Sequence, residues 1–313
     1  MASQSSRRIV LIAIAANLGI VVCKYTAAAF TGSSAMLAEA FHSTADVGNE
    51  LLLYVGLKRS TQPPDELHPY GHGKVLYFYS LLVAVYIFAI GGMFALYEGV
   101  SKLRHPTLSQ HTGWSYAVLA LSAAFDLYSW KVAYKELVSR KEPQESTWQE
   151  IIGSKDPTVF TVFLEDSAGL VGGGLAFLGI FLGHRFHNPK LDPIASILIA
   201  AVLCGVAIVL GRESGALLVG ERTNRAKIRR VRQIIERDSA VERVGDLLTM
   251  QLGPDQVLLT VNIRFRRGLD LPQLEATVAR LEERIKKEDP TIERIFIEAN
   301  SLRQPPRKIS EAA

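Results

Sequence analysis

Residues 34–57 read SAMLAEAFHSTADVGNELLLYVGL, an apolar stretch of bilayer-spanning length that nevertheless contains several ionisable side chains. Four of these side chains share one stripe of the predicted helix, because they fall at i, i+3, i+7 and i+11. They are Glu39, His42, Asp46 and Glu50. Ionisable groups are costly in hydrocarbon, so such a stripe faces protein or water and marks a functional site. The stretch therefore predicts a membrane helix with a polar inner face.

The whole chain divides into an apolar part and a charged part. Its 313 residues are 48% hydrophobic with a mean hydropathy of +0.16, yet 21% of them are charged. This combination implies two unequal parts. Six apolar runs reach about 20 residues, the length that crosses a bilayer. The runs are 9–30, 34–57, 75–100, 114–135, 159–182 and 193–211. We expect an α-helical membrane protein whose transmembrane domain has six helices and covers residues 1–211.

Residues 212–313 predict a separate small α/β domain, because charged residues become frequent at Arg212 and no further run has spanning length. The stretch VLLTVNIRF (257–265) alternates apolar and polar residues like a strand with one buried face. The predicted order is αββαβ, a small sheet covered by two helices. Its elements are a helix at 224–237, strands at 244–252 and 257–265, a helix at 271–289 and a strand at 291–300. The domain contains no His and no Cys, so dimerisation or regulation is favoured over metal sensing.

Topology and composition limit the function classes. An even number of spans places both termini on one side, and Arg7, Arg8 and the Lys-containing loop 137–156 favour the cytoplasm. The net charge of +4 is too small to indicate nucleic-acid binding. Cys23 and Cys204 both lie in predicted spans and form no disulfide framework. Neither a Walker motif nor a catalytic triad is present, so the sequence does not predict an enzyme.

Two predicted spans carry metal-ligating residue types. His42 and Asp46 lie one helical turn apart and offer a nitrogen and an oxygen to one ion, the mixture that suits Zn²⁺ and neighbouring divalent metals. One helix cannot complete a tetrahedral shell. The fifth span, FTVFLEDSAGLVGGGLAF (160–177), supplies Glu165 and Asp166 as partners.

A second cluster lies in the loop TQPPDELHPYGHGK (61–74), between the second and third spans. Asp65, His68 and His72 place three ligand-type residues within eight positions. They form either a surface metal site or a set of solvated loop residues.

Four runs of the sequence together resemble the cation diffusion facilitator family of zinc and related metal transporters. The runs are GSSAMLAEAFHSTADVGNE (32–50), HPYGHGK (68–74), LYEGVSKLRHP (96–106) and DPIASILIA (192–200). The resemblance covers nearly the whole chain. It implies a homodimeric antiporter that exports divalent metal from the cytoplasm in exchange for protons, with a ferredoxin-like or metallochaperone-like tail. The substrate it implies is Zn²⁺, or else Mn²⁺, Fe²⁺, Co²⁺ or Cd²⁺, with no permanently bound cofactor.

The resemblance also implies ligand roles. His42 and Asp46 match the two ligands of the family's second span, and Asp166 matches the second ligand of the fifth span. One turn before Asp166 the family usually has His or Asp, but this chain has Val162. Glu165 lies about 100° around the helix, so it joins the site only if the helix rotates or distorts. A water in the fourth position is the alternative. The LEDSAG segment is similar to the zinc transporter nine branch of the family.

Other positions carry weaker expectations. Asp65, His68 and His72 align with residues that bind a second, peripheral metal in some members of the family. Glu39 and Glu50 are candidates for a proton pathway, with helix–helix hydrogen bonding as the alternative. Two polar residues on one face of the first span, Asn17 and Lys24, are expected to pair with these acids.

The end of the tail departs from the family's pattern. Glu298 and Asn300 occupy the end of the last strand, where the family's inter-subunit zinc residues would place His. Closure of the tail by zinc is therefore not expected.

Two expectations concern the protein as a whole. The rival to a transporter is a membrane scaffold that responds to metal but moves none, because Val162 removes one ligand. The start of the sequence shows no targeting segment, which favours a bacterial inner membrane.

Overall fold

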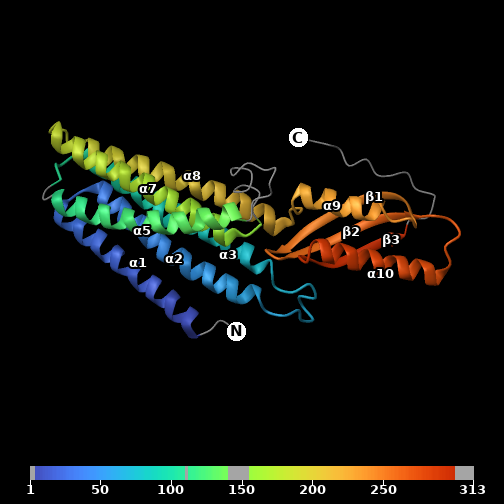
Figure 1. Ribbon diagram of the computed structural model, residues 1–313. Coiled ribbons are helices and arrows are strands. Elements are labelled where there is room, and N and C mark those ends of the chain that lie inside the picture. Colours follow the sequence, from blue (N-terminus) through green and yellow to red (C-terminus); the bar gives the residue numbers. More distant parts are fainter. Residues whose placement is uncertain (1–3, 110–111, 140–154, 300–313) are drawn as a thin grey trace. The chain divides into compact units, whose positions relative to one another are not determined.

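The computed structural model describes residues 4–109, 112–139 and 155–299, which form helices and one small sheet (Figure 1). The chain divides into two compact units. One consists of Met1–Thr61 and Val75–Gly215, and the other of Gln62–Lys74 and Ala216–Ala313. The loop with Asp65, His68 and His72 thus belongs to the second unit.

Long helices build the first unit, and each predicted apolar run lies within one helical segment. The segments are α1 (Gln4–Thr31), α2 (Ser34–Ser60), α3 (Val75–Tyr86) continued by η1 (Ile87–Met93) and α4 (Phe94–Arg104), α5 (Thr112–Ser139), α7 (Pro157–Arg185) and α8 (Leu191–Val219). Among the described residues, three stretches are long and apolar enough to cross a membrane. They are Val75–Arg104, Pro157–Arg185 and Leu191–Val219. Helix α2 contains several ionisable residues, which lower its hydropathy.

Helix α2 lies in the middle of this unit and contacts α1, α3 and α7. Its start is fixed by a hydrogen-bonded turn. Ser33 caps the helix by accepting from the backbone N–H of Met36 at 3.1 Å. Asp192, at the start of α8, accepts from the Ser33 hydroxyl at 2.6 Å and from the Ser34 backbone N–H at 2.7 Å. Gly32 precedes them with φ +66°, a conformation that favours glycine. These hydrogen bonds join the runs 32–50 and 192–200, two of those that carry the family resemblance, at one end of the bundle.

Small residues let α8 approach its neighbours closely. A Cβ placed on Gly99 of α4 would lie 2.7 Å from Ile197 Cγ1, and one on Gly92 would lie 2.6 Å from Cys204 Sγ. Such contacts allow van der Waals packing between helix backbones, the usual basis of helix association in a membrane.

The second unit confirms the predicted αββαβ order. It contains α9 (Arg225–Glu236), β1 (Val241–Gly253), β2 (Gln256–Phe265), α10 (Leu271–Glu288) and β3 (Ile292–Ala299). The sheet order is β1-β2-β3, with β1 antiparallel and β3 parallel to β2. Alternate residues of β2 are buried, as the sequence alternation predicts, and pack in a core with both helices. That core includes Val257, Leu259, Val261 and Ile263 of β2, Val231 and Ile235 of α9, and Leu281 and Ile285 of α10.

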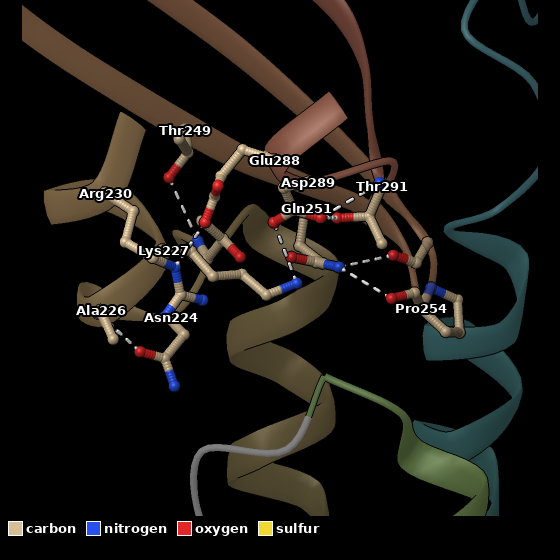
Figure 2. Close-up of polar contacts among 12 residues, drawn as sticks. Asn224, Ala226, Lys227, Arg230, Thr249, Gln251, Pro254, Glu288, Asp289 and Thr291 are labelled. Carbon is tan, nitrogen blue, oxygen red and sulfur yellow. Dashed lines mark hydrogen bonds and ion pairs between the residues drawn. The ribbon is translucent and has the colours of Figure 1, made fainter. Parts of the chain in front are cut away.

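Ion pairs tie the start of α9 to the end of α10, as Figure 2 shows. Lys227 Nζ lies 3.1 Å from Asp289 Oδ2, and Arg230 Nε lies 3.3 Å from Glu288 Oε1. The partly buried pair is the stronger one, because surface pairs contribute about 0–1 kcal/mol. The pairs fix the relative position of the two helices that cover the sheet.

Asp238 forms a second anchor in this unit. Its side chain is 4% exposed and accepts from Arg280 Nε and Nη2, both at 3.0 Å. These hydrogen bonds hold the pKa of Asp238 below its ordinary value of 3.8. A carboxyl whose pKa is lowered by folding stabilises the fold above its unfolded pKa, and this contribution disappears as the pH falls toward the folded pKa.

We expect Asp238→Asn to destabilise the second unit by about 2 kcal/mol at neutral pH, because it removes charge-assisted hydrogen bonds from a buried site. The deficit relative to wild type should begin to shrink below about pH 4, where the carboxyl of the unfolded wild-type chain becomes protonated. It should disappear as the pH falls through the lower pKa of the folded state. Hydrogen-exchange protection factors of α10 in the full chain measure the difference. Glu236→Gln is the matched control, because it also replaces a carboxylate that pairs with an Arg, but at the surface. Glu236 is 52% exposed, and its Oε1 lies 3.8 Å from Arg232 Nη1. Equal protection in both variants at neutral pH would contradict the assignment.

Candidate metal centre

A cavity of about 320 Å³ lies among α1, α2, α5 and α7 in the first unit. Five carboxylates line it: Asp46, Glu50, Asp126, Glu165 and Asp166. Its other lining residues are Asn17, Ile20, Ser43, Phe125, Tyr128, Ser129 and Val162. A concentration of acids in the interior of an apolar helix bundle is costly unless cations or protons balance it.

His42 lies beside Asp46, which lines this cavity, as their spacing predicts. His42 is 3% exposed, and its Nδ1 lies 3.4 Å from Asp46 Oδ1. Neither of these two buried atoms has a hydrogen-bond partner among the described residues. Buried polar atoms are normally satisfied, so an unsatisfied imidazole beside an unsatisfied carboxylate indicates a place for a missing cation.

Helix α7 brings Val162, Glu165 and Asp166 to the same cavity. The helix is continuous from Pro157 to Arg185, and Glu165 lines the cavity from it, while its role as a metal ligand stays a prediction. Its carboxylate accepts from Asn49 Nδ2 of α2 at 2.7 Å. Asp166 Oδ2 is buried and has no hydrogen-bond partner among the described residues. The cavity is wide enough to expose two neighbouring faces of α7.

Helix α5 contributes Asp126 to the cavity, an acid that the predicted site does not include. A Cβ placed on Gly169 of α7 would lie 3.0 Å from Asp126 Oδ2 and 3.2 Å from His42 Nε2. The absence of a side chain at Gly169 therefore lets both groups approach α7 at one point. The signal was available, because Asp126 is the one acidic residue within the predicted run 114–135.

The expected partners in α1 pair with the flanking acids, which confirms that prediction. Lys24 Nζ donates to Glu39 Oε2 at 3.0 Å and to Ser43 Oγ at 2.8 Å. Asn17 Nδ2 donates to Glu50 Oε1 at 2.6 Å. Glu39 and Glu50 thus both have a hydrogen-bonding role, and their place in a proton pathway stays a prediction.

The charges of this interior do not balance. Lys24 is 1% exposed and is the one buried Lys or Arg in the described part of the chain. Glu39, its ion-pair partner, is fully buried. Within the described ranges, none of the five carboxylates that line the cavity forms an ion pair with Lys or Arg. The site therefore favours a divalent cation or protons as the missing positive charge.

The possible ligand atoms around the cavity are not close enough to one another to bind one ion as they stand. In the described ranges, one group of three His, Cys, Asp or Glu has all its ligand atoms within 4.8 Å of one another, and it is Asp65, His68 and His72. Asp46 and Asp166 therefore line one cavity, with His42 beside Asp46, but the three residues do not form a compact shell. Side-chain movement would be needed to close them around an ion.

The loop cluster is compact. His68 Nδ1 lies 3.1 Å from Asp65 Oδ1, and His72 Nε2 lies 3.1 Å from Asp65 Oδ2. The His68 backbone N–H also donates to Asp65 Oδ1 at 2.6 Å, and this bond lowers the pKa of Asp65. Within the second unit, Arg294 supports the loop by donating to the Pro69 carbonyl at 3.4 Å. Two imidazoles and one carboxylate are a usual protein ligand set for zinc, with water in the fourth position.

The predicted tail positions lie at the end of β3. Glu298 Oε2 accepts from Asn262 Nδ2 at 3.1 Å. Asn300 lies outside the described residues.

Comparison with known proteins identifies the first unit. Residues 10–219 match the sequence profile of the cation efflux transmembrane domain. The mouse protein named "Proton-coupled zinc antiporter SLC30A9, mitochondrial" is 30% identical over 259 residues, which are 82% of this chain and 46% of that protein. The chain thus spans about half the length of this relative.

Two bacterial relatives are covered more completely. The manganese efflux system protein MneP of Bacillus subtilis is 24% identical over 304 residues, 95% of this chain and 96% of MneP. The magnetosome protein MamM of Paramagnetospirillum magneticum is 28% identical over 257 residues, 80% of this chain and 74% of MamM. Since the domain match covers most of the chain, the protein belongs to the cation efflux family, the cation diffusion facilitators, whose members are membrane transporters of metal cations.

Proposed function

We propose that the protein is a proton-coupled antiporter that exports a divalent transition metal, above all Zn²⁺, from the cytoplasm. One observation carries the proposal. Five carboxylates line the interior cavity, and the His42 imidazole lies 3.4 Å from one of them, Asp46. Several buried atoms of these groups lack a hydrogen-bond partner in the described structure. Such a site is complete only with a cation or with protons.

In this proposal six helices cross the bilayer. Helices α1, α2 and α5 supply the three spans beyond the stretches named above, and together with α7 they carry the polar residues that line the cavity. Their ionisable side chains face protein and the cavity, which is where a membrane protein tolerates them. Both termini lie in the cytoplasm by the distribution of Lys and Arg.

We also propose the domain division and setting of this transporter. Residues 1–211 form the transport domain, and residues 212–313 form a cytoplasmic domain for dimerisation or regulation in a homodimer. We place the protein in a bacterial cytoplasmic membrane, and the nearly full-length match to the Bacillus subtilis relative supports that setting.

Exchange follows from competition at one site. His42, Asp46 and Asp166 would hold the metal, and each must lose its proton before it can bind. Metal and protons therefore compete for the same atoms. Rocking of the helices would expose the site to one side of the membrane and then to the other, with protons loading where metal leaves. Glu39 and Glu50 would extend the proton route along α2.

The ligand set favours Zn²⁺ among the divalent metals. An imidazole with carboxylates suits zinc, but Mn²⁺, Fe²⁺, Co²⁺ and Cd²⁺ accept similar donors, and geometry decides among them. The names of the relatives mention both zinc and manganese. We therefore rank Zn²⁺ first and Mn²⁺ second.

We further propose that Asp65, His68 and His72 bind a second metal ion with a structural role. Their ligand atoms are already within 4.8 Å of one another. This ion would fix the loop within the second unit and would not be transported.

Metal flux into proteoliposomes under an imposed pH gradient tests the proposed function. With Zn²⁺, Mn²⁺, Fe²⁺ and Co²⁺ assayed in parallel, we expect Zn²⁺ uptake coupled to proton movement in the opposite direction. If folded, dimeric protein moves none of the four metals, the scaffold interpretation replaces the antiporter, and Val162 accounts for the loss.

A further inference from the structure

Val162 leaves the transport site one side-chain ligand short, and the cavity offers a substitute on a different helix. We propose that Asp126 of α5 is the fourth ligand of the transported metal, so that three helices, α2, α5 and α7, share the ion. This inference rests on the proposed transport function and names a ligand that it leaves open.

The position of Asp126 supports a ligand role. Its Oδ2 and the Nε2 of His42 approach the same point of α7, at 3.0 Å and 3.2 Å from a Cβ placed on Gly169. Gly169 lies one turn after Asp166, on the side of Asp166 opposite to Val162. Along α7, Asp126 therefore approaches Asp166 from the end where Gly169 lies. Val162, where the family usually has a ligand, lies one turn beyond Asp166 in the other direction.

Unsatisfied atoms around Asp126 indicate what the site lacks. His42 is 3% exposed, and its Nδ1 has no hydrogen-bond partner in the described part of the chain. The same holds for Asp46 Oδ1 and Asp166 Oδ2. All three acids, Asp46, Asp126 and Asp166, line the one cavity. A cation placed among them would satisfy atoms that no described side chain satisfies.

Glu165 is the competing candidate, and its contacts make it the weaker one. Its Oε1 already accepts from Asn49 at 2.7 Å, so metal binding there would sacrifice a buried hydrogen bond. Asp126 instead lies beside Gly169, which has no side chain, close to His42 Nε2. One imidazole and three carboxylates form a nitrogen and oxygen site for Zn²⁺, Co²⁺ or Mn²⁺.

The test measures metal binding by the full chain. His68→Ala and His72→Ala are introduced first, so that the loop cluster contributes nothing. In this parent, Zn²⁺ affinity is measured by chelator competition, and Co²⁺ absorption reports the coordination. We expect Asp126→Asn to weaken binding at least about 100-fold, because even a lost hydrogen-bond partner of a ligand costs about 10–100-fold.

Rescue separates a ligand from a merely structural residue. Val162→His restores the donor that the family usually has, so adding it to Asp126→Asn should recover most of the affinity and the Co²⁺ spectrum. Asp126→His, which keeps a donor, should also bind. Tyr128→Phe is the matched control on α5, since Tyr128 lines the cavity but carries no carboxylate.

Each contrary result has a distinct meaning. If Asp46→Asn loses binding but Asp126→Asn retains the parent affinity, Asp126 is not a ligand and the proposed transport site stands. Loss in Asp126→Asn without recovery by Val162→His also overturns the ligand assignment. If neither Asp46→Asn nor Asp126→Asn changes binding, the cavity is not the metal site, and the proposed function fails with it.

Discussion

Asp46→Asn is expected to reduce metal flux to the level of empty liposomes while the protein remains folded. Asp46 is the carboxylate that lies 3.4 Å from His42 and faces the cavity that Glu165 and Asp166 also line. The substitution keeps the size of the side chain but removes the charge that draws in the cation. A neutral amide also takes up and releases no proton in the working pH range. Both metal transport and the coupled proton transport should therefore stop.

The control for Asp46→Asn is the same substitution at Asp65. Asp65 belongs to the loop cluster in the second unit, so Asp65→Asn should lower the number of metal ions bound and leave most of the flux intact. Flux retained in Asp46→Asn, or lost equally in both variants, would show that the cavity is not the route.

Lys24→Met is expected to cause the largest loss of stability in the helical unit, about 3–5 kcal/mol. Lys24 and Glu39 are 1% and 0% exposed and lie 3.0 Å apart. Removing Lys24 leaves a buried carboxylate without its cation, and the Ser43 hydroxyl loses its donor. Thermal unfolding in detergent, followed by size-exclusion chromatography, measures the loss.

The double variant Lys24→Met with Glu39→Leu is the informative comparison. Replacing a whole buried ion pair by apolar residues is often neutral or stabilising, so the double variant should recover most of the lost stability. If its loss equals the sum of the two single losses, the side chains do not act as a pair. Flux by the double variant then reports whether Glu39 belongs to the proton route.

The sequence predicts the helices and the small domain well, because both depend on local patterns. The apolar runs mark the long helices, and the alternation in VLLTVNIRF marks β2 with its buried face. The stripe on α2 and the pairing of Asn17 and Lys24 with its acids also follow from helical spacing.

The composition of the cavity could not be predicted in the same way, since it depends on how helices rotate against one another. On a helical wheel Glu165 lies about 100° away from Asp166, yet it lines the same cavity from a continuous helix. Asp126 stands alone in its span, so no spacing connects it to His42 until Gly169 brings the two together. The role of Asp192 in capping α2 likewise joins residues 158 positions apart.

An anomalous difference map at the zinc edge, from the full chain with Zn²⁺ bound, tests the central claim most directly. We predict a peak within the helical unit, between His42, Asp46 and Asp166, that disappears in Asp46→Asn, together with a separate peak at the loop cluster. Zinc bound at the loop cluster alone, with none in the cavity of the wild-type protein, would contradict the account.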